Sequence, residues 1–126
     1  MILLGSGIDI VELKRMKTIV DRHEDRFAER VLHPKELTEL AEVSNSVAFI
    51  AKRFAVKEAA SKALGVGIGE KLSFTDMYVE HDPLGKPMLK FTQECIIKLN
   101  LEKTHSLLTI ADEQAYAVAH VLLYSN

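Results

Sequence analysis

The sequence has little cysteine, no tryptophan and no long apolar segment, and each shortage excludes a class of protein. Cys95 is the single cysteine among 126 residues, so no internal disulfide can form, and we expect a protein of the reducing cytoplasm. The apolar runs are far shorter than a membrane-spanning helix, and the first residues lack the basic start and the cleavage site of a signal peptide. We therefore expect neither a membrane protein nor a secreted one.

An excess of charge of one sign is also lacking. The chain carries 16 Lys and Arg against 18 Asp and Glu, its net charge is −2, and no basic block stands out. We expect no nucleic-acid partner, since such proteins gather positive charge on one surface. A composition of 48% apolar and 27% charged residues excludes a disordered chain, and the length fits one small domain over residues 1–126.

The first half of the chain is predicted to form a strand followed by helices. The apolar start is typical of a strand, and a helix follows with its inward positions at Leu13, Met16, Ile19 and Val20. His33-Pro34 starts a short helix, whose inward positions are Leu37, Leu40 and Ala41. A long helix is predicted over residues 46–64, capped by Asn45 or Ser46 and ended by Gly65.

The second half changes from helical to extended periodicity. Residues 76–82 and 86–91 flank Asp82-Pro83-Leu84-Gly85, a favoured type I turn, and predict a hairpin. Thr92 caps a helix that is predicted to run to about Leu101, with Cys95, Ile96 and Leu99 facing inward. A closing hairpin pairs residues 106–111 with 115–124. The fold class is α+β, with mostly antiparallel strands packed against a long central helix.

Two segments are apolar on more than one face. The segment AYAVAHVLLY (115–124) is apolar on both faces, and the long helix has a second apolar face formed by Phe49, Val56, Ala60 and Ala63. Burying both faces of both segments is difficult in so small a domain. We therefore expect another copy of the chain to cover part of this surface.

Glu58 and Lys62 stand where an apolar stripe of the long helix would continue. At 100° per residue they fall in line with Val47, Ile50 and Phe54, and they are one turn apart. An exposed ion pair on the helix surface is one interpretation. A ligand site is the other, because the flexible segment GVGIG (65–69) follows directly, and its small residues let a ligand approach the backbone closely.

Asp9 is flanked by Ile8 and Ile10 in the first strand, where an unpaired carboxylate would be costly to bury. It is either the partner of a structural ion pair or, together with Glu58, an oxygen ligand. Mg²⁺ is commonly held by one or two carboxylates with phosphate oxygens and water, and Lys62 would then neutralise a phosphate. The sequence has no zinc-type ligand spacing and no G-x-S-x-G nucleophile motif. These residue types favour magnesium-dependent phosphoryl chemistry.

Two motifs carry a resemblance to a known family. GIDIVEL (7–13) and RFAVKEAASKALG (53–65), about 40 residues apart, resemble the holo-acyl-carrier-protein synthases, the small bacterial branch of the 4′-phosphopantetheinyl transferases. The likeness continues through segments that span nearly the whole chain: RFAERVL (26–32), GVGIG (65–69), LSF (72–74), GKP (85–87) and DEQAYAVAHV (112–121). Such enzymes transfer the phosphopantetheine arm of coenzyme A to a serine of apo acyl carrier protein and release adenosine 3′,5′-bisphosphate.

The resemblance implies a role for each matching residue. It implies that Asp9 and Glu58 hold Mg²⁺, that Lys62 contacts phosphate, and that the enzyme is a homotrimer with coenzyme A between neighbouring subunits. Arg15 and Arg26 match positions that dock the acidic carrier protein, although both also fit an ordinary solvated face. We add candidates for contact with coenzyme A from the glycine-rich segment and from charge alone: Gly65, Gly67, Arg53 and Lys86.

One position departs from the family pattern. Many members have a His-Thr pair before the last hairpin turn, where it contacts the 3′-phosphate of coenzyme A, and this sequence has Ala111-Asp112. That contact is therefore not transferred to this chain. Either Glu58 or a metal-bound water is the general base, and we favour the water with Glu58 orienting it. The alternatives to an enzyme are a non-catalytic module that binds coenzyme A or a nucleotide, and a structural oligomerisation domain.

Overall fold

The chain folds as helices packed against two antiparallel sheets, in a computed structural model that describes residues 1–23 and 25–126. The strands are β1 (Ile2–Glu12), β2 (Met77–His81), β3 (Pro87–Phe91), β4 (His105–Asp112) and β5 (Tyr116–Ser125). The helices are α1 (Leu13–His23), α2 (Asp25–Val31), α3 (Pro34–Leu40), α4 (Ser46–Leu64) and α5 (Gln93–Lys98), with a short 3₁₀ turn at Phe74–Asp76. No helix among these residues is long and apolar enough to span a membrane.

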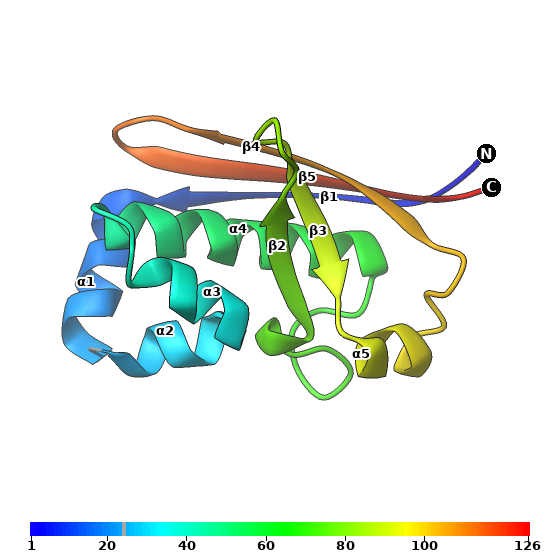
Figure 1. The fold of residues 1–126 in the computed structure, drawn as a ribbon, viewed down its shortest axis with the longest axis horizontal. Coiled ribbons are helices and arrows are strands. Elements are labelled where there is room, and N and C mark those ends of the chain that lie inside the picture. The colour runs from blue at the N-terminus through cyan, green and yellow to red at the C-terminus, as the bar shows by residue number, and fades with distance from the viewer. Residues whose placement is uncertain (24) are drawn as a thin grey trace.

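The larger sheet has the order β1-β5-β4, and all its strands are antiparallel. It forms one layer over α4, and the two chain ends lie together at one edge of this layer (Figure 1). β2 and β3 form a separate hairpin, whose turn is held by Asp82 Oδ1 accepting from the backbone N–H groups of Leu84 (2.9 Å) and Lys86 (2.8 Å). The predicted α+β class and both predicted hairpins are confirmed.

Local sequence signals fix the ends of α4 as predicted. Asn45 Oδ1 accepts from the backbone N–H of Ala48 at 3.0 Å, and Gly65 ends the helix with φ 73°. α5 is shorter than predicted, because Asn100 adopts φ 56° and reverses the chain. The N–H of Leu101 then bonds to the carbonyl of Ile96 at 2.8 Å, a pattern that closes a helix end.

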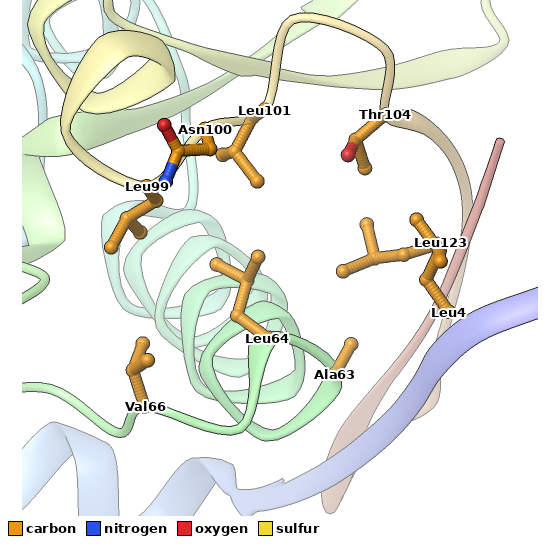
Figure 2. Close-up of a pocket in the computed structure, with 9 residues that line it drawn as sticks. All are labelled: Leu4, Ala63, Leu64, Val66, Leu99, Asn100, Leu101, Thr104 and Leu123. Atoms are coloured by element: carbon orange, nitrogen blue, oxygen red, sulfur yellow. The ribbon is translucent and has the colours of Figure 1, made fainter.

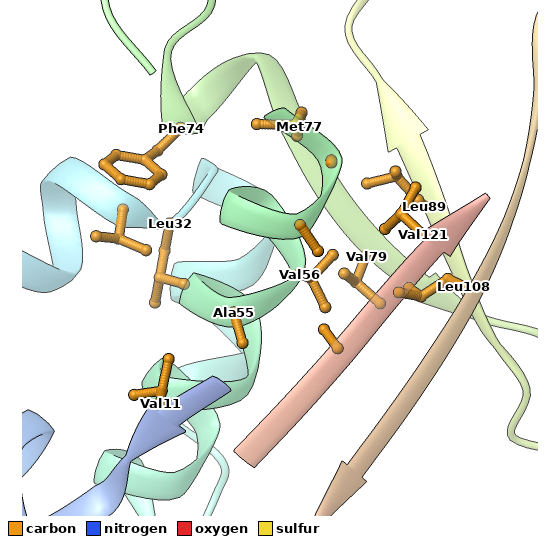
Figure 3. Packing of buried hydrophobic residues seen from close by; sticks show 14 of the residues in the cluster. Val11, Leu32, Ala55, Val56, Phe74, Met77, Val79, Leu89, Leu108 and Val121 are labelled. Atoms are coloured by element: carbon orange, nitrogen blue, oxygen red, sulfur yellow. The ribbon is translucent and has the colours of Figure 1, made fainter. Parts of the chain in front are cut away.

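α4 is buried on nearly all sides by its own chain. This corrects the expectation that a second copy of the chain helps to cover its second apolar face. The face formed by Phe49, Val56, Ala60 and Ala63 is covered within the subunit, where α4 packs against β1 and β5. Figure 3 shows Val56 on α4 facing Val79, Leu108 and Val121 from the strands. The alanine-rich sequence allows this, since small side chains let a sheet pack closely on a helix. That face of α4 is therefore no evidence for a second copy.

α3 also differs from its prediction at one position. Leu37 and Leu40 pack against the core, but Ala41 is the exposed residue that ends the helix. The inward position is taken by Glu36, which is fully buried. Its carboxylate is paired, so α3 buries a charge at a position that the periodicity did not single out.

Candidate functional site

Two glycines bring β1 against the C-terminal half of α4. A Cβ atom on Gly7 would overlap the carbonyl oxygen of Ala59, and one on Gly5 would overlap that of Ala63. Only residues without a side chain allow the two backbones to approach this closely. The approach brings Asp9, two residues after Gly7, beside the last two turns of α4.

Asp9, Glu58 and Lys62 meet at this contact, as the sequence predicted. Lys62 Nζ donates to Asp9 Oδ1 at 3.1 Å and to the backbone carbonyl of Ile8 at 2.8 Å. The side chain of Asp9 is 17% exposed and that of Lys62 is 53% exposed, so the pair lies at the protein surface. Glu58 stands one turn earlier on α4, and with Asp9 it lines a groove of about 510 Å³.

The electrostatics of Glu58 suit a cation. Its burial disfavours the charged form and raises its pKa, the negative charge of Asp9 raises the pKa further, and Lys62 only partly opposes both effects. Asp9 forms an ion pair with Lys62, whereas Glu58 forms none in the part of the chain that the structure describes. No group of three or more His, Cys, Asp or Glu side chains gathers in residues 1–23 and 25–126, which argues against a site made wholly of protein ligands. The donor set fits Mg²⁺ completed by water and phosphate oxygens.

The groove beyond the carboxylates has apolar walls, and Arg15 adds a positive charge to its lining. Its walls come from β1, α1, α2 and α4, with Met16, Ile19, Phe27 and Phe54 among the lining side chains. Arg15 lines this groove and also a neighbouring hollow on α1 of about 570 Å³ that includes Lys14 and Arg22. Arg26 is exposed on α2 and lines neither. The structure thus brings Arg15, but not Arg26, to the groove.

The glycine segment after α4 leaves its backbone open to a ligand. Gly65 and Gly67 adopt φ 73° and φ 64°, a left-handed conformation that favours glycine. A Cβ atom on either would meet no other atom within 4 Å. The segment begins three residues after Lys62, so a group held by the ammonium lies within reach of this backbone.

Arg53 and Lys86 do not lie with this group. Arg53 is buried, and its guanidinium donates to Glu36 Oε2 at 3.0 Å and to Glu39 Oε2 at 3.3 Å. Lys86 is exposed at the β2–β3 turn, beside a different hollow. The buried ion pairs give Arg53 a structural role, and a contact with phosphate beside Asp9 is excluded by its position.

Sequence reasoning missed the buried charge network in which Arg53 takes part. Glu36 Oε1 accepts from Lys57 Nζ at 2.6 Å, and its other oxygen accepts from Arg53 and from the backbone N–H of Val79 at 3.0 Å. Lys57 Nζ also donates to the carbonyl of Val31 at 2.6 Å. Glu36 lies in the first turn of α3 and forms a capping box with His33, a local signal that the sequence contains. Nothing in the local sequence shows that its charged group turns into the protein interior.

At the position where many family members have a His-Thr pair, this chain has Asp112, which forms an ion pair with Lys52 of α4. Lys52 Nζ lies 3.9 Å from Asp112 Oδ2, and both line a hollow of about 420 Å³ together with Arg53 and Pro87. Lys52 was not among the residues singled out from the sequence. Its i,i+4 and i,i−4 neighbours on the helix gave no hint of a partner on β4.

A further hollow of about 220 Å³ lies at the C-terminal end of α4 (Figure 2). Its lining is apolar apart from Asn100 and Thr104, and it contains no ionisable side chain: Leu4, Ala63, Leu64, Val66, Leu99, Leu101 and Leu123 complete it. It therefore offers no group for phosphoryl chemistry.

The larger sheet leaves an apolar face that no part of the described chain covers. Because side chains alternate along a strand, the residues that point away from α4 share this outer face. The outer face consists of Ile8 and Ile10 of β1, Val118, His120 and Leu122 of β5, and Leu107 and Thr109 of β4. Ile8, Ile10 and Leu107 are exposed on it. The Nε2 atom of His120 lies 3.1 Å from Ser6 Oγ, which provides the polar contact within this face.

Comparisons with known proteins place the chain among close relatives. The profile of the 4′-phosphopantetheinyl transferase superfamily matches residues 5–120. The chain is 46% identical to the holo-[acyl-carrier-protein] synthase of Sodalis glossinidius (strain morsitans) over 123 residues, 97% of this chain and 98% of the relative.

Two solved structures are similar over nearly the whole chain. The holo-[acyl-carrier-protein] synthase of Neisseria meningitidis shares 36% identity with a TM-score of 0.92, covering 99% of this chain and 100% of that one. The synthase of Bacillus anthracis str. Ames, solved in complex with CoA (3′,5′-ADP), shares 36% identity with a TM-score of 0.85, covering 100% of both chains.

Proposed function

Because the chain belongs to the 4′-phosphopantetheinyl transferase superfamily, in its branch of holo-acyl-carrier-protein synthases, we propose that it transfers 4′-phosphopantetheine from coenzyme A to a serine of apo acyl carrier protein. Adenosine 3′,5′-bisphosphate is the product released. The observation that carries the proposal is the meeting of Asp9, Glu58 and Lys62 beside an open groove. The reaction serves fatty-acid synthesis, and its place is the cytoplasm.

Asp9 and Glu58 would hold Mg²⁺, which neutralises the pyrophosphate and the charge that builds on the leaving bisphosphate. Support comes from the two carboxylates lining one groove, with the ammonium of Lys62 3.1 Å from Asp9 Oδ1. Asp9 is fixed by β1, whereas Glu58 is fixed by α4. The close contact at Gly7 therefore sets the distance between the two ligands.

Lys62 would contact a phosphate of coenzyme A, and the open backbone at Gly65 and Gly67 would lie along the ligand. Arg53 and Lys86 would contact only the part of coenzyme A that lies far from Asp9. In support, Pro87 of the GKP sequence lines two hollows, one together with Arg53 and the other together with Lys86.

The carrier serine must lose its proton during transfer. Glu58 is the carboxylate of the groove whose burial favours proton uptake, so it can accept that proton or orient a water that does. The apolar walls contributed by Phe27 and Phe54 keep bulk water away from the attacking oxygen.

The acidic carrier protein would dock on α1. Arg15 supports this, since it lines both the groove and the hollow beside it that includes Lys14 and Arg22. Arg26, exposed on the next helix, is the second proposed contact. Reversing the charge at Arg15 should weaken binding of the carrier and reduce the salt dependence of the rate. An unchanged salt profile would remove Arg15 from the docking surface.

The assembly would be a homotrimer with coenzyme A bound between neighbouring subunits. The uncovered apolar outer face of the sheet supports an assembly, since a contiguous apolar patch is commonly covered by a partner. In this proposal, residues of a second copy contribute contacts to coenzyme A.

The test is the intact mass of apo acyl carrier protein after incubation with this protein, coenzyme A and Mg²⁺, with EDTA added to a parallel sample. A mass gain of one phosphopantetheine that EDTA abolishes is the expected result. No gain with a competent carrier would reject the reaction, and titration with coenzyme A would then show whether the chain is a binding module instead.

A further inference from the structure

We infer that Lys62 is the internal counter-cation of the carboxylate site: without a divalent ion its ammonium takes the cation position at Asp9, and it must leave before the ion binds. This inference rests on the proposed function and adds a step to it. The released ammonium becomes the phosphate contact, so that loading of the ion prepares the site for coenzyme A.

The position of the Lys62 side chain supports this inference. Lys62 lies on the exposed face of α4, where a lysine ordinarily extends into water. Here its ammonium turns back to β1 and donates to two oxygens, the carbonyl of Ile8 at 2.8 Å and Asp9 Oδ1 at 3.1 Å. A contact with both a carbonyl and a carboxylate is the ligation that a bound cation would receive.

A divalent ion at Asp9 would lie beside the ammonium that this carboxylate already contacts. Lys62 Nζ donates to Asp9 Oδ1 at 3.1 Å, and Asp9 lines the groove that Glu58 also lines. Within residues 1–23 and 25–126, Lys62 makes the sole ion pair to either carboxylate. A divalent ion next to this ammonium would meet strong repulsion, since like charges at contact distance are unfavourable in a partly buried site. Binding of the ion at Asp9 and contact of Lys62 with the same carboxylate therefore oppose each other.

The exchange keeps the charge of the site close to neutral. Asp9, Glu58 and Lys62 together carry one negative charge, and a divalent ion turns this into one positive charge. Phosphate groups of coenzyme A then neutralise the excess. The freed ammonium has a short path to them, because Gly65 and its open backbone begin less than one turn after Lys62.

The test measures the affinity for Mn²⁺ alone, without coenzyme A, from the free Mn²⁺ signal in electron paramagnetic resonance. Lys62→Met keeps the length of the side chain and removes its charge. The variant should bind Mn²⁺ about tenfold more tightly than the unaltered protein, the equivalent of one charge-assisted hydrogen bond. Lys62→Arg keeps the competing charge and should bind no more tightly than the unaltered protein.

Arg15→Met is the matched control for a general electrostatic effect. It removes one positive charge from the same groove, but Arg15 makes no ion pair with Asp9 or Glu58. At about 0.3 M salt, where charges that are not in contact are screened, it should change the Mn²⁺ affinity by less than about threefold. Circular dichroism confirms that each variant is folded.

The inference is overturned if Lys62→Met binds Mn²⁺ within about twofold of the unaltered protein, or if Arg15→Met gains as much affinity. Transfer activity separates this failure from failure of the proposed function. If the unaltered protein modifies the carrier in a Mg²⁺-dependent manner but Lys62→Met leaves the Mn²⁺ affinity unchanged, only the inference about Lys62 is rejected. If the protein neither binds Mn²⁺ nor modifies the carrier, both the inference and the proposed function are rejected.

Discussion

Glu58 is half buried, faces Asp9 and lies one turn from Lys62, and these three facts set its chemistry. Burial removes water from the carboxylate, and the charge of Asp9 adds repulsion, so a proton or a cation is favoured there. The same glutamate on an open helix surface would only form a weak i,i+4 ion pair. Its local environment, more than its residue type, suits it to the role of metal ligand that we propose.

The affinity for Mg²⁺ should depend on pH through Glu58. Because the pKa of Glu58 is raised, the carboxyl stays protonated to a higher pH than an ordinary glutamate, and a proton competes with the ion. Affinity should therefore rise with pH through this raised pKa, and it should be lost as pH falls below it. Mn²⁺ titrations across a pH series measure the midpoint. A midpoint at or below the ordinary range of glutamate would contradict the assignment, and Glu58→Gln should flatten the profile.

The buried ion pair of Glu36 should contribute far more to stability than an ion pair of the same length at the surface. Its ion pair with Lys57 and the surface pair Lys17–Asp21 both measure 2.6 Å, but the first pair is 0% exposed and the second is 65% and 61% exposed. Glu36→Gln should lower the free energy of unfolding by about 3–5 kcal/mol, because it leaves the charges of Lys57 and Arg53 buried without their partner. Urea denaturation measures this loss.

Asp21→Asn is the control for that measurement. It breaks an ion pair of equal length in water, and we expect a change below about 0.5 kcal/mol. Equal losses in the two variants would show that burial does not set the strength of these pairs in this protein.

At the scale of elements, the position of β1 against α4 is the feature on which the site depends. The contact is made by backbone, with Gly7 against Ala59, so no side chain can adjust to take up a change there. A shift of the strand moves Asp9 relative to Glu58 directly.

Gly7→Ala should damage both the fold and the metal site. The added methyl group must push β1 away from α4, which should cost about 1–3 kcal/mol of stability as overpacking does. It should also raise the Mg²⁺ concentration needed for half-maximal activity, because Asp9 moves with the strand. Gly69→Ala adds the same methyl group in open space and should change stability by less than about 0.5 kcal/mol. Retention of full metal affinity in Gly7→Ala would show that the strand does not set the distance.

The elements show where sequence reasoning succeeds. The ends of α4 were predictable because Asn45 and Gly65 act locally, through their own hydrogen bonds and backbone conformation. The ion pair of Glu36 with Lys57 was not, since its partners are 21 residues apart and any of the many acidic and basic side chains could have met.

Two further outcomes show the same limit. The meeting of Asp9 with Glu58 joins a strand to a helix. The chemistry of the residues gave it as one of two interpretations of Asp9, and the family resemblance then implied it. The second apolar face of α4 was counted with residues 115–124 as surface that another copy partly covers, because periodicity reports which residues are apolar and not which part of the chain covers them.

At the scale of the whole molecule, the outer face of the sheet predicts the assembly. Sedimentation of the unaltered protein should give a mass near three times that of the chain. Leu107→Lys places a charge on this face, at a side chain that is 46% exposed in the single chain, so the subunit should fold but sediment as a monomer. If coenzyme A binds between neighbouring subunits, this monomeric variant should lose most of its transfer activity.

Leu84→Lys is the matched control, since Leu84 is 95% exposed at the tip of the β2–β3 hairpin. It should leave the assembly unchanged. A monomeric unaltered protein, or a trimeric Leu107→Lys variant, would show that the outer face is not the interface.

The order of the strands has a consequence for how the chain is made. β5 lies between β1 and β4 in the sheet, yet it is the last of these elements to leave the ribosome. At roughly 5–20 residues per second, β1 waits on the order of ten seconds for β5, the strand with which it pairs. During this time its exposed edge and apolar side chains are open to chaperones. The site at Asp9 is therefore completed after synthesis of the chain has nearly finished, and a nascent chain lacking β5 cannot be active.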